Sequence, residues 1–285
     1  MNWTTLVPAQ ELAARLGDPA LRIVDARFVL AGAAPDAGES AWREAHIPGA
    51  GYAHLDRDLS DHRKPASHGR HPMPEASDFV ATLARLGIGP QHQVGVYDAG
   101  DAAMAAARFW WLLRLLGHQR VAVLDGGWAH WTQLGLPVTA EVAAPVAPPA
   151  GFAPRFDENQ VAGDEEVAAR LGEAPGWILD ARAPERFRGE VEPLDRVAGH
   201  IPGARNRPFV QNLRDGVFAP AQELRAAFAE LIGARAPSDI LLSCGSGVTA
   251  CQNLLAMEHA GLHGARVYAG SWSGWISDPT RPIEK

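Results

Sequence analysis

The chain repeats its own sequence once, and this duplication constrains the fold more than any other feature. Residues 23–27 (Ile-Val-Asp-Ala-Arg) match 178–182 (Ile-Leu-Asp-Ala-Arg), and the pentapeptide His-Ile-Pro-Gly-Ala stands at 46–50 and again at 200–204. A third pair, 124–128 and 268–272, keeps the same order, so the offsets are 155, 154 and 144 residues. A period of this length indicates two duplicated domains and excludes a solenoid of short repeats.

A proline-rich stretch joins the two copies. Between residues 141 and 154 the prolines at 145, 148, 149 and 154 stand among small side chains, which predicts an extended, stiff linker. We therefore predict one domain over residues 1–140, a linker over 141–160 and a second domain over 161–285. A chain of 285 residues is long enough for two domains of ordinary size.

Short apolar runs alternate with amphipathic stretches in each half, which indicates an α/β fold. In the second half we predict strands at 177–181 and 240–243, and helices beginning near 165, over 221–232 and over 248–260. In the first half we predict strands at 94–97 and 121–124, and helices over 74–86 and 102–116. Such alternation is typical of a mostly parallel central sheet, and right-handed crossovers then place helices on both of its faces.

Composition and charge exclude several classes of protein. Hydrophobic residues make up 47% and charged residues 21%, which is ordinary globular composition. A net charge of −7 argues against a nucleic-acid partner, because phosphates require a concentrated basic surface. No apolar run approaches the ~18 residues of a transmembrane helix, and no signal peptide is visible, so we expect a cytoplasmic protein with no membrane partner. Two cysteines are too few for a secreted disulfide scaffold or a four-cysteine zinc site.

The two halves differ at the carboxyl end of one predicted strand, where α/β sheets place their sites. The strand at 240–243 runs into Cys-Gly-Ser-Gly-Val-Thr at 244–249, whereas its counterpart at 94–97 runs into Asp98. Asp98 therefore stands in the repeat where the second half has Cys244.

Cys244 lies in a loop suited to holding an anion. Gly245 and Gly247 let the backbone turn tightly and point its N–H groups inward, and the helix beginning near Val248 adds its positive dipole end. A thiolate there is expected to have a lowered pKa and to act as a nucleophile. The alternative for any cysteine is core packing, which suits Cys251 better, because it stands inside the following helix among apolar neighbours.

The same loop would stabilise a persulfide, whose terminal charge lies further out. Ser246 and Thr249 could donate hydroxyl hydrogen bonds to that charge. We expect Gly245, Gly247, Val248 and Thr249 to contact the donor of the extra sulfur atom.

These motifs together resemble the tandem-domain rhodaneses. The loop at 244–250, the paired His-Ile-Pro-Gly-Ala segments and the Gly-Gly-Trp and Gly-Ser-Trp turns carry the resemblance, which covers about residues 5–280. Within that family the loop is most similar to that of the 3-mercaptopyruvate sulfurtransferases. The resemblance implies two rhodanese-like domains, of which only the C-terminal one is catalytic, with the site in the cleft between them.

The resemblance also implies the reaction. Such proteins move sulfane sulfur from a donor onto the cysteine and then to a thiol, thioredoxin among the candidates, or to cyanide, with no cofactor and no metal. Thiosulfate-specific members carry Arg and Lys inside the loop, whereas this chain has neutral Gly245 and Ser246. A neutral loop favours mercaptopyruvate over the thiosulfate dianion, and thiosulfate stays open as the alternative donor.

The donor carboxylate needs a cation, and Arg186 matches the substrate arginine of the family. The family often has a second arginine nine residues later, but this chain has Asp195 there. Either Arg196, one residue beyond, or Arg188 could take its place, and each is equally well explained as a surface residue.

A histidine is the other candidate. The resemblance implies that His46, with the loop serine and an acidic residue, forms a proton relay, for which Asp36, Glu39 and Glu44 are the acidic candidates. The alternative is a structural role, because His200 repeats His46 in the other half.

Two further groups of residues are interpreted as structural. The aspartates of the two Asp-Ala-Arg segments, Asp25 and Asp180, end buried strands and are expected to bind backbone N–H groups. The histidines and aspartates between residues 54 and 71 stand among prolines and lack the spacing of a metal site, so we interpret this stretch as a polar surface loop. These residues are His54, Asp56, Asp58, Asp61, His62, His68 and His71.

Two other functions remain to be weighed. A cysteine phosphatase of this fold type needs an arginine six residues after the cysteine, where this chain has Ala250. A persulfide carrier would load once and then require a partner protein, so catalytic turnover separates it from an enzyme.

Overall fold

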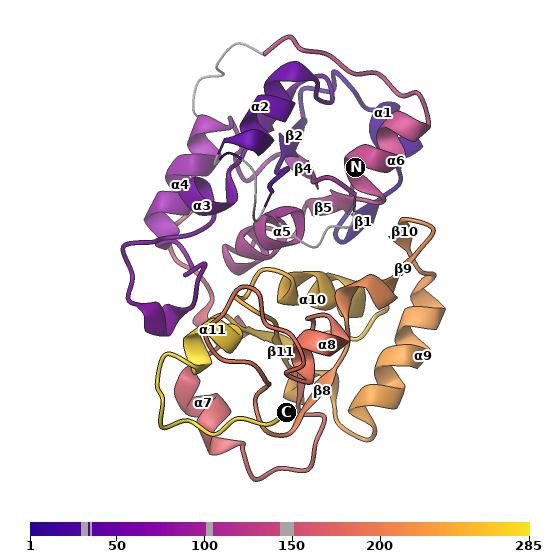
Figure 1. Cartoon of the computed structure of the whole chain (residues 1–285). Helices are drawn as coiled ribbons and strands as arrows, with labels where there is room; N and C mark the ends of the chain where they lie inside the picture. The colour runs from indigo at the N-terminus through magenta and orange to yellow at the C-terminus, as the bar shows by residue number, and fades with distance from the viewer. Residues whose placement is uncertain (30–33, 35, 101–104, 143–150) are drawn as a thin grey trace. The chain divides into compact units, whose positions relative to one another are not determined.

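The computed structural model describes residues 1–29, 34, 36–100, 105–142 and 151–285 (Figure 1). The chain divides into two compact units. Unit 1 consists of residues 1–60, 74–157 and 215–217, and unit 2 consists of 61–73, 158–214 and 218–285. The segment 61–73 thus comes from the first half of the sequence but folds with the second. Part of the predicted linker, residues 143–150, lies outside the described residues, as do 102–104 at the start of one predicted helix.

Unit 1 is built on a five-stranded sheet with the order β1-β5-β4-β2-β3, and every neighbouring pair is parallel. The strands are β1 (Leu6–Val7), β2 (Leu21–Asp25), β3 (Ala50–Tyr52), β4 (Gln93–Tyr97) and β5 (Val121–Leu124). The helices are α1 (Ala9–Ala13), α2 (Ala37–Glu44), α3 (Leu55–Asp58), α4 (Ala76–Arg85), α5 (Ala105–Leu115) and α6 (Gly127–Gln133).

Unit 2 repeats this topology with the order β6-β12-β11-β7-β8, again parallel throughout. The strands are β6 (Val161–Ala162), β7 (Ile178–Asp180), β8 (Ala204–Asn206), β11 (Leu241–Ser243) and β12 (Arg266–Tyr268). The α-helices are α7 (Asp164–Ala169), α8 (Pro184–Phe187), α9 (Ala221–Ile232), α10 (Ala250–His259) and α11 (Ser271–Trp275). Short 3-10 turns are η1 (Ala66–His68), η2 (Glu158–Gln160), η3 (Phe209–Asn212) and η4 (Pro237–Asp239), and β9 (Leu213–Arg214) with β10 (Val217–Phe218) forms a separate two-stranded sheet.

The central strands are buried on both faces, which explains why they read as continuous apolar runs. All five residues of β4 and all three of β11 are buried, although successive side chains of a strand point to opposite faces. In unit 1 one face packs against Leu12 of α1 and Trp131 of α6. The predicted α/β fold, with a parallel sheet and helices on both faces, is therefore confirmed in each unit.

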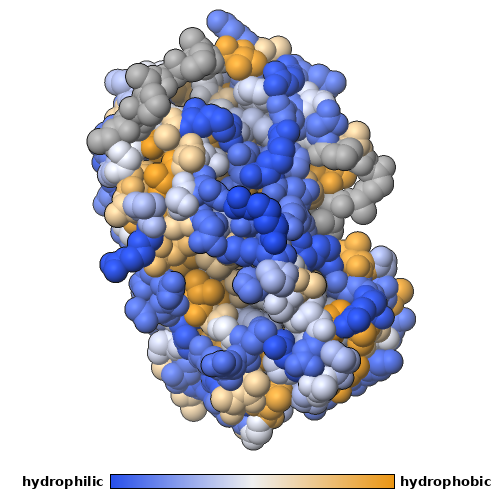
Figure 2. Space-filling model, turned by 90° about the vertical axis from the view of Figure 1, so that its left-hand side faces the viewer, coloured by the Kyte–Doolittle hydropathy of each residue, from blue (hydrophilic) through white to orange (hydrophobic). Residues whose placement is uncertain are grey.

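On the face shown in Figure 2, the surface is mainly hydrophilic, with hydrophobic residues interspersed among the hydrophilic ones. None of the helices formed by the described residues has both the length and the hydrophobicity needed to span a bilayer.

Candidate active site

The strand register fixes the position of Cys244 in the fold. Tyr97, the last residue of β4, and Ser243, the last residue of β11, pair with the aspartates of the two Asp-Ala-Arg segments. The residues that follow, Asp98 and Cys244, are therefore equivalent, as the repeat predicts. Cys244 lies at the carboxyl end of the middle strand of the sheet, just before the turn into α10.

The Cys244 loop turns its backbone toward the sulfur atom. Sγ of Cys244 accepts a hydrogen bond from the Gly247 N–H at 3.1 Å, and the Cys244 N–H donates to Ser271 Oγ at 3.1 Å. Gly247 has φ +77°, and a Cβ there would lie 2.3 Å from the Ala269 carbonyl oxygen, so this turn requires glycine. The loop thus has an inward N–H at the thiol, as the sequence predicts, and the thiol itself is buried.

Cys251 lies in the first turns of α10 and is fully buried. Its Sγ donates to the Gly247 carbonyl oxygen at 3.3 Å. The prediction that Cys251 is buried inside the helix is confirmed.

Ser246 contacts a histidine that the sequence analysis did not select. Nδ1 of His71 lies 2.7 Å from Ser246 Oγ, and both side chains are buried. The interpretation of the residues between 54 and 71 as a surface loop is wrong for His54, which caps α3 in unit 1, and for Asp61 and His71; all three are buried. Asp61 and His71 are buried because the segment 61–73 is part of unit 2. Within that unit η1 lies against α11 (Figure 1), and the Arg70 N–H donates to Ser273 Oγ at 2.9 Å.

Two arginines lie over the residue that follows the cysteine. A Cβ built on Gly245 would lie 3.2 Å from Nη2 of Arg70 and 3.5 Å from Nη2 of Arg186. Arg186 is the predicted substrate arginine, whereas Arg70 was missed. Arg70 stands next to His71, so two consecutive residues of the segment 61–73 face two consecutive residues of the Cys244 loop.

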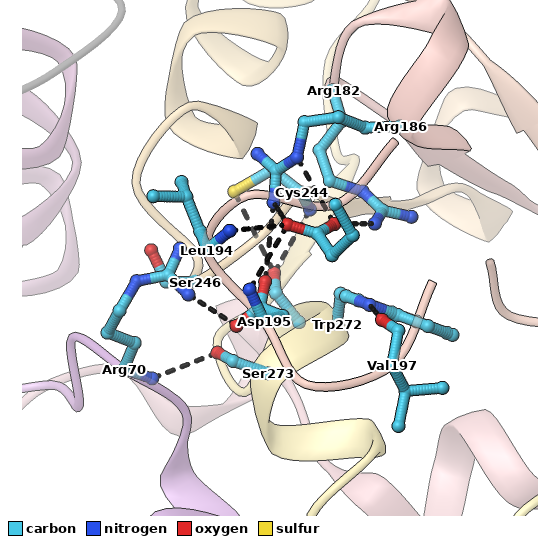
Figure 3. A network of polar contacts seen from close by, with 12 residues as sticks. Arg70, Arg182, Arg186, Leu194, Asp195, Val197, Cys244, Ser246, Trp272 and Ser273 are labelled. Carbon is cyan, nitrogen blue, oxygen red and sulfur yellow. Dashed lines mark hydrogen bonds and ion pairs between the residues drawn. The ribbon is translucent and has the colours of Figure 1, made fainter. Parts of the chain in front are cut away.

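Two carboxylates, Glu192 and Asp195, hold these arginines; Figure 3 labels Asp195 near Arg70 and Arg186. Glu192 receives hydrogen bonds from Nε and Nη2 of Arg186 at 3.2 and 2.7 Å, which hold the pKa of Glu192 below its ordinary value despite the opposing effect of burial. Asp195 bonds Arg70 through Oδ1 and lies 3.3 Å from Arg186 Nη2 through Oδ2. Burial raises the pKa of Asp195, although Arg70 and Arg186 act in the opposite direction.

The Asp-Ala-Arg segment of unit 2 lies next to the site and forms its own buried ion pair. Asp180 accepts the Arg182 backbone N–H at 2.9 Å and also pairs with the Arg182 side chain at 2.7 Å. Burial opposes the Arg182 charge, but Asp180, Glu192 and the nearby Cys244 raise the pKa of Arg182. The equivalent pair in unit 1, Asp25 and Arg27, repeats this geometry, which confirms that these aspartates bind backbone N–H groups.

The other predicted site residues have different neighbours. Arg188 is exposed and pairs with Glu190, while Arg196 donates to the carbonyl oxygens of Ile276 and Ser277 at the end of α11. His46 belongs to unit 1 and is fully buried, and its ring nitrogens lie 2.7 and 3.2 Å from the carbonyl oxygens of Trp42 and Glu141. Its equivalent, His200, likewise contacts a backbone carbonyl, that of Phe187. Val248 is buried and Thr249 precedes α10, both within the loop.

A duplicated α/β unit with a cysteine loop at the carboxyl end of one middle strand defines a class of protein. Comparison with known protein families identifies that class. The model of the rhodanese-like domain matches residues 8–134 and 164–278, so the chain belongs to the rhodanese-like family and carries two copies of its domain.

Three related proteins show how far the similarity extends. A Pseudomonas aeruginosa protein named "Probable 3-mercaptopyruvate sulfurtransferase" is 44% identical over 285 residues, which is 99% of each chain. A Mycobacterium tuberculosis protein named "Putative thiosulfate sulfurtransferase SseB" is 40% identical over 98% of this chain and 96% of its own. The structure of the 3-mercaptopyruvate sulfurtransferase from Leishmania major superposes with a TM-score of 0.83 at 31% identity, over 97% of this chain and 76% of that one.

Proposed function

We propose that this chain is a sulfurtransferase that takes the sulfur atom of 3-mercaptopyruvate onto Cys244 and passes it to a thiol or to cyanide. One observation carries the proposal: Sγ of Cys244 accepts the Gly247 N–H, and the guanidinium groups of Arg70 and Arg186 lie over the adjacent Gly245. A nucleophile and two cations thus lie together, which suits a short anionic thiol as the donor. The names of the Pseudomonas and Leishmania relatives support the same donor.

The chemistry balances without a cofactor. The Cys244 thiolate attacks the donor sulfur, a new S–S bond forms, and the bond between that sulfur and C3 of mercaptopyruvate breaks. The electron pair of the broken bond goes to C3 as the enolate of pyruvate, and the proton of the donor thiol ends on C3. In the second half-reaction an acceptor thiolate or cyanide attacks the outer sulfur, and the Cys244 thiolate leaves.

Separate groups stabilise the charges that these steps develop. The Gly247 N–H donates to the cysteine sulfur, and a bidentate contact from Arg186 or Arg70 suits the donor carboxylate. The hydrogen-bonded pair of Ser246 and His71 is placed to move the donor's proton, because a hydroxyl 2.7 Å from an imidazole nitrogen can exchange it. We propose His71 for this role, and the predicted roles of His46, Arg188 and Arg196 stay predictions.

Thiosulfate is the second candidate donor, and the name of the Mycobacterium relative favours it. The carboxylates of Asp195 and Glu192 offset the two arginines, which favours a monoanion over a dianion. A cytoplasmic location, where thiols stay reduced, and thioredoxin as one acceptor belong to the same proposal.

The test is a donor comparison on one preparation. Purified protein is given mercaptopyruvate or thiosulfate, with cyanide, dithiothreitol or reduced thioredoxin as acceptor, and pyruvate, thiocyanate and sulfide are followed. We expect multiple turnovers with mercaptopyruvate and a higher kcat/KM than with thiosulfate. Mass spectrometry after donor alone should show one added sulfur atom on the Cys244 peptide. A single loading without turnover would instead identify a persulfide carrier, and a higher kcat/KM for thiosulfate would identify the second donor.

A further inference from the structure

The carboxylate of Asp195 already occupies the space between the two arginines of the site. Its Oδ1 bonds Nη1 of Arg70, and its Oδ2 lies 3.3 Å from Nη2 of Arg186. Figure 3 shows the labelled Asp195 beside the loop of Cys244 and Ser246, linked to Arg70. The Asp195 side chain is only 6% exposed, so this carboxylate is a built-in group of the site.

The backbone of Arg70 is held against the Cys244 loop, which places its side chain at the site. Its backbone N–H donates to Ser273 Oγ, and the Ser273 N–H donates to the Gly245 carbonyl oxygen, both at 2.9 Å. Ser273 therefore connects Arg70 to the residue over which its guanidinium lies.

The two arginines differ in the carboxylate partners that they keep when the Asp195 carboxylate is displaced. Arg186 keeps the bidentate contact with Glu192, which also accepts the backbone N–H groups of Leu194 and Asp195 at 3.0 and 3.1 Å. Arg70 has Asp195 as its carboxylate partner, and its Nε is buried and, in the described part of the chain, has no hydrogen-bond partner. An incoming carboxylate can therefore replace that of Asp195 on Arg70 while Glu192 still holds Arg186 in place.

The charges of this cluster cancel. Two guanidinium groups face two carboxylates, so the space beside Cys244 carries close to zero net charge before a donor binds. Replacing one monocarboxylate by another preserves this balance. The Coulomb repulsion between the Asp195 carboxylate and a dianionic donor is about twice that with a monoanionic donor at the same place, because Coulomb energy scales with the product of the charges.

We propose that Asp195 is a specificity-determining residue. Its carboxylate is the counterion of Arg70 and Arg186 in the free protein, and the carboxylate of a monoanionic donor displaces it. The negative charge of Asp195 selects against dianionic sulfur donors. This inference rests on the proposed function and adds a basis for donor choice. It also assigns Arg70 as the second arginine of the site.

The experiment measures donor preference in the wild-type chain, in Asp195→Asn and in a matched control. The neutral amide keeps the shape of the side chain but removes its charge, so the ratio of kcat/KM for thiosulfate to that for mercaptopyruvate should rise about tenfold or more. Glu223→Gln removes an exposed carboxylate that pairs with Arg214 in unit 2, and the ratio should stay at its wild-type value. Cyanide serves as acceptor throughout, and thermal unfolding verifies that each variant is folded.

A second pair of variants keeps the proposal testable if the amide disturbs folding. Asp195→Ser also removes the charge and should raise the ratio, whereas Asp195→Glu keeps the charge and should leave the ratio within about twofold of wild type. An unchanged ratio in folded Asp195→Asn or Asp195→Ser, beside normal wild-type turnover of mercaptopyruvate, overturns the inference and leaves the proposed function intact. Failure of the wild-type chain to turn over either donor overturns the proposed function itself.

Discussion

Nδ1 of His71 and Oγ of Ser246 lie 2.7 Å apart, both buried, and they join a loop from the first half of the chain to the cysteine loop of the second. If this pair moves the donor's proton, His71→Ala should lower kcat for mercaptopyruvate about 100-fold, because general acid–base groups contribute roughly that much. Persulfide transfer to an acceptor by preloaded enzyme should change less. Steady-state pyruvate release together with single-turnover transfer from loaded enzyme separates the two steps.

The control for that variant is His68→Ala, which removes an exposed imidazole from the same segment. It should keep wild-type kcat. Equal rates in the wild type and in folded His71→Ala would remove His71 from the reaction and make its contact with Ser246 purely structural.

Cys244→Ser should abolish sulfur transfer and leave the thermal unfolding temperature within a few degrees of wild type. The change removes the nucleophile and, besides it, two weak hydrogen bonds to sulfur, those from the Gly247 N–H and the Ser271 hydroxyl. Cys251→Ser should retain most of the activity, because its sulfur is buried inside α10 and donates to a loop carbonyl, an interaction that a hydroxyl can also make. Intact-mass analysis after incubation with donor should show added sulfur in the second variant; turnover by the first would exclude a Cys244 persulfide.

Arg186→Ala should raise KM for mercaptopyruvate about 10- to 100-fold with a smaller change in kcat, as expected for the loss of one charge-assisted hydrogen-bonding group. Arg188→Ala is the matched control, because Arg188 is exposed and pairs with Glu190. Initial rates over a range of donor concentrations give both constants. If the Arg188 variant shows the larger KM, the carboxylate site must be moved toward Arg188.

The fold was predictable from the sequence because the signals for strands and helices are local. Part of the site, the residues Arg70 and His71, was not predictable in this way. Apolar runs such as the one ending at Ser243 identify buried strands, and the glycines around Cys244 identify the tight loop that follows. Arg70 and His71 stand in a proline-containing stretch without periodicity, so the sequence shows their residue types but not that the segment packs on unit 2. The adjacent pair Arg70 and His71, between Gly69 and Pro72, was the available signal, and it specifies no partner.

The loop glycines provide a test that separates folding from binding. Gly247→Ala places a Cβ 2.3 Å from the Ala269 carbonyl oxygen at a left-handed φ, so it should cost at least about 2 kcal/mol of unfolding free energy and nearly all activity. Gly245→Ala places its Cβ against the ends of two flexible arginine side chains, so it should raise KM and leave stability nearly unchanged. Denaturant unfolding and donor titration of both variants measure the two effects, and equal stability losses would contradict this account.

Acid should destabilise unit 1 through a buried histidine. Nδ1 of His92 accepts the Gly89 N–H at 2.9 Å, and burial, with help from Arg22, His118 and Arg120, lowers the pKa of His92. A histidine whose pKa is lower in the folded state than in the unfolded state contributes its full stability above the unfolded pKa of about 6.5 and loses it as the pH falls below that value.

The thermal unfolding temperature should therefore fall between about pH 7 and pH 5, and His92→Asn, whose amide oxygen can still accept the Gly89 N–H, should weaken that dependence. His68→Asn, at an exposed position, should follow the wild-type curve. Parallel curves for the wild type and His92→Asn would show that protonation of His92 does not limit the acid stability of this chain.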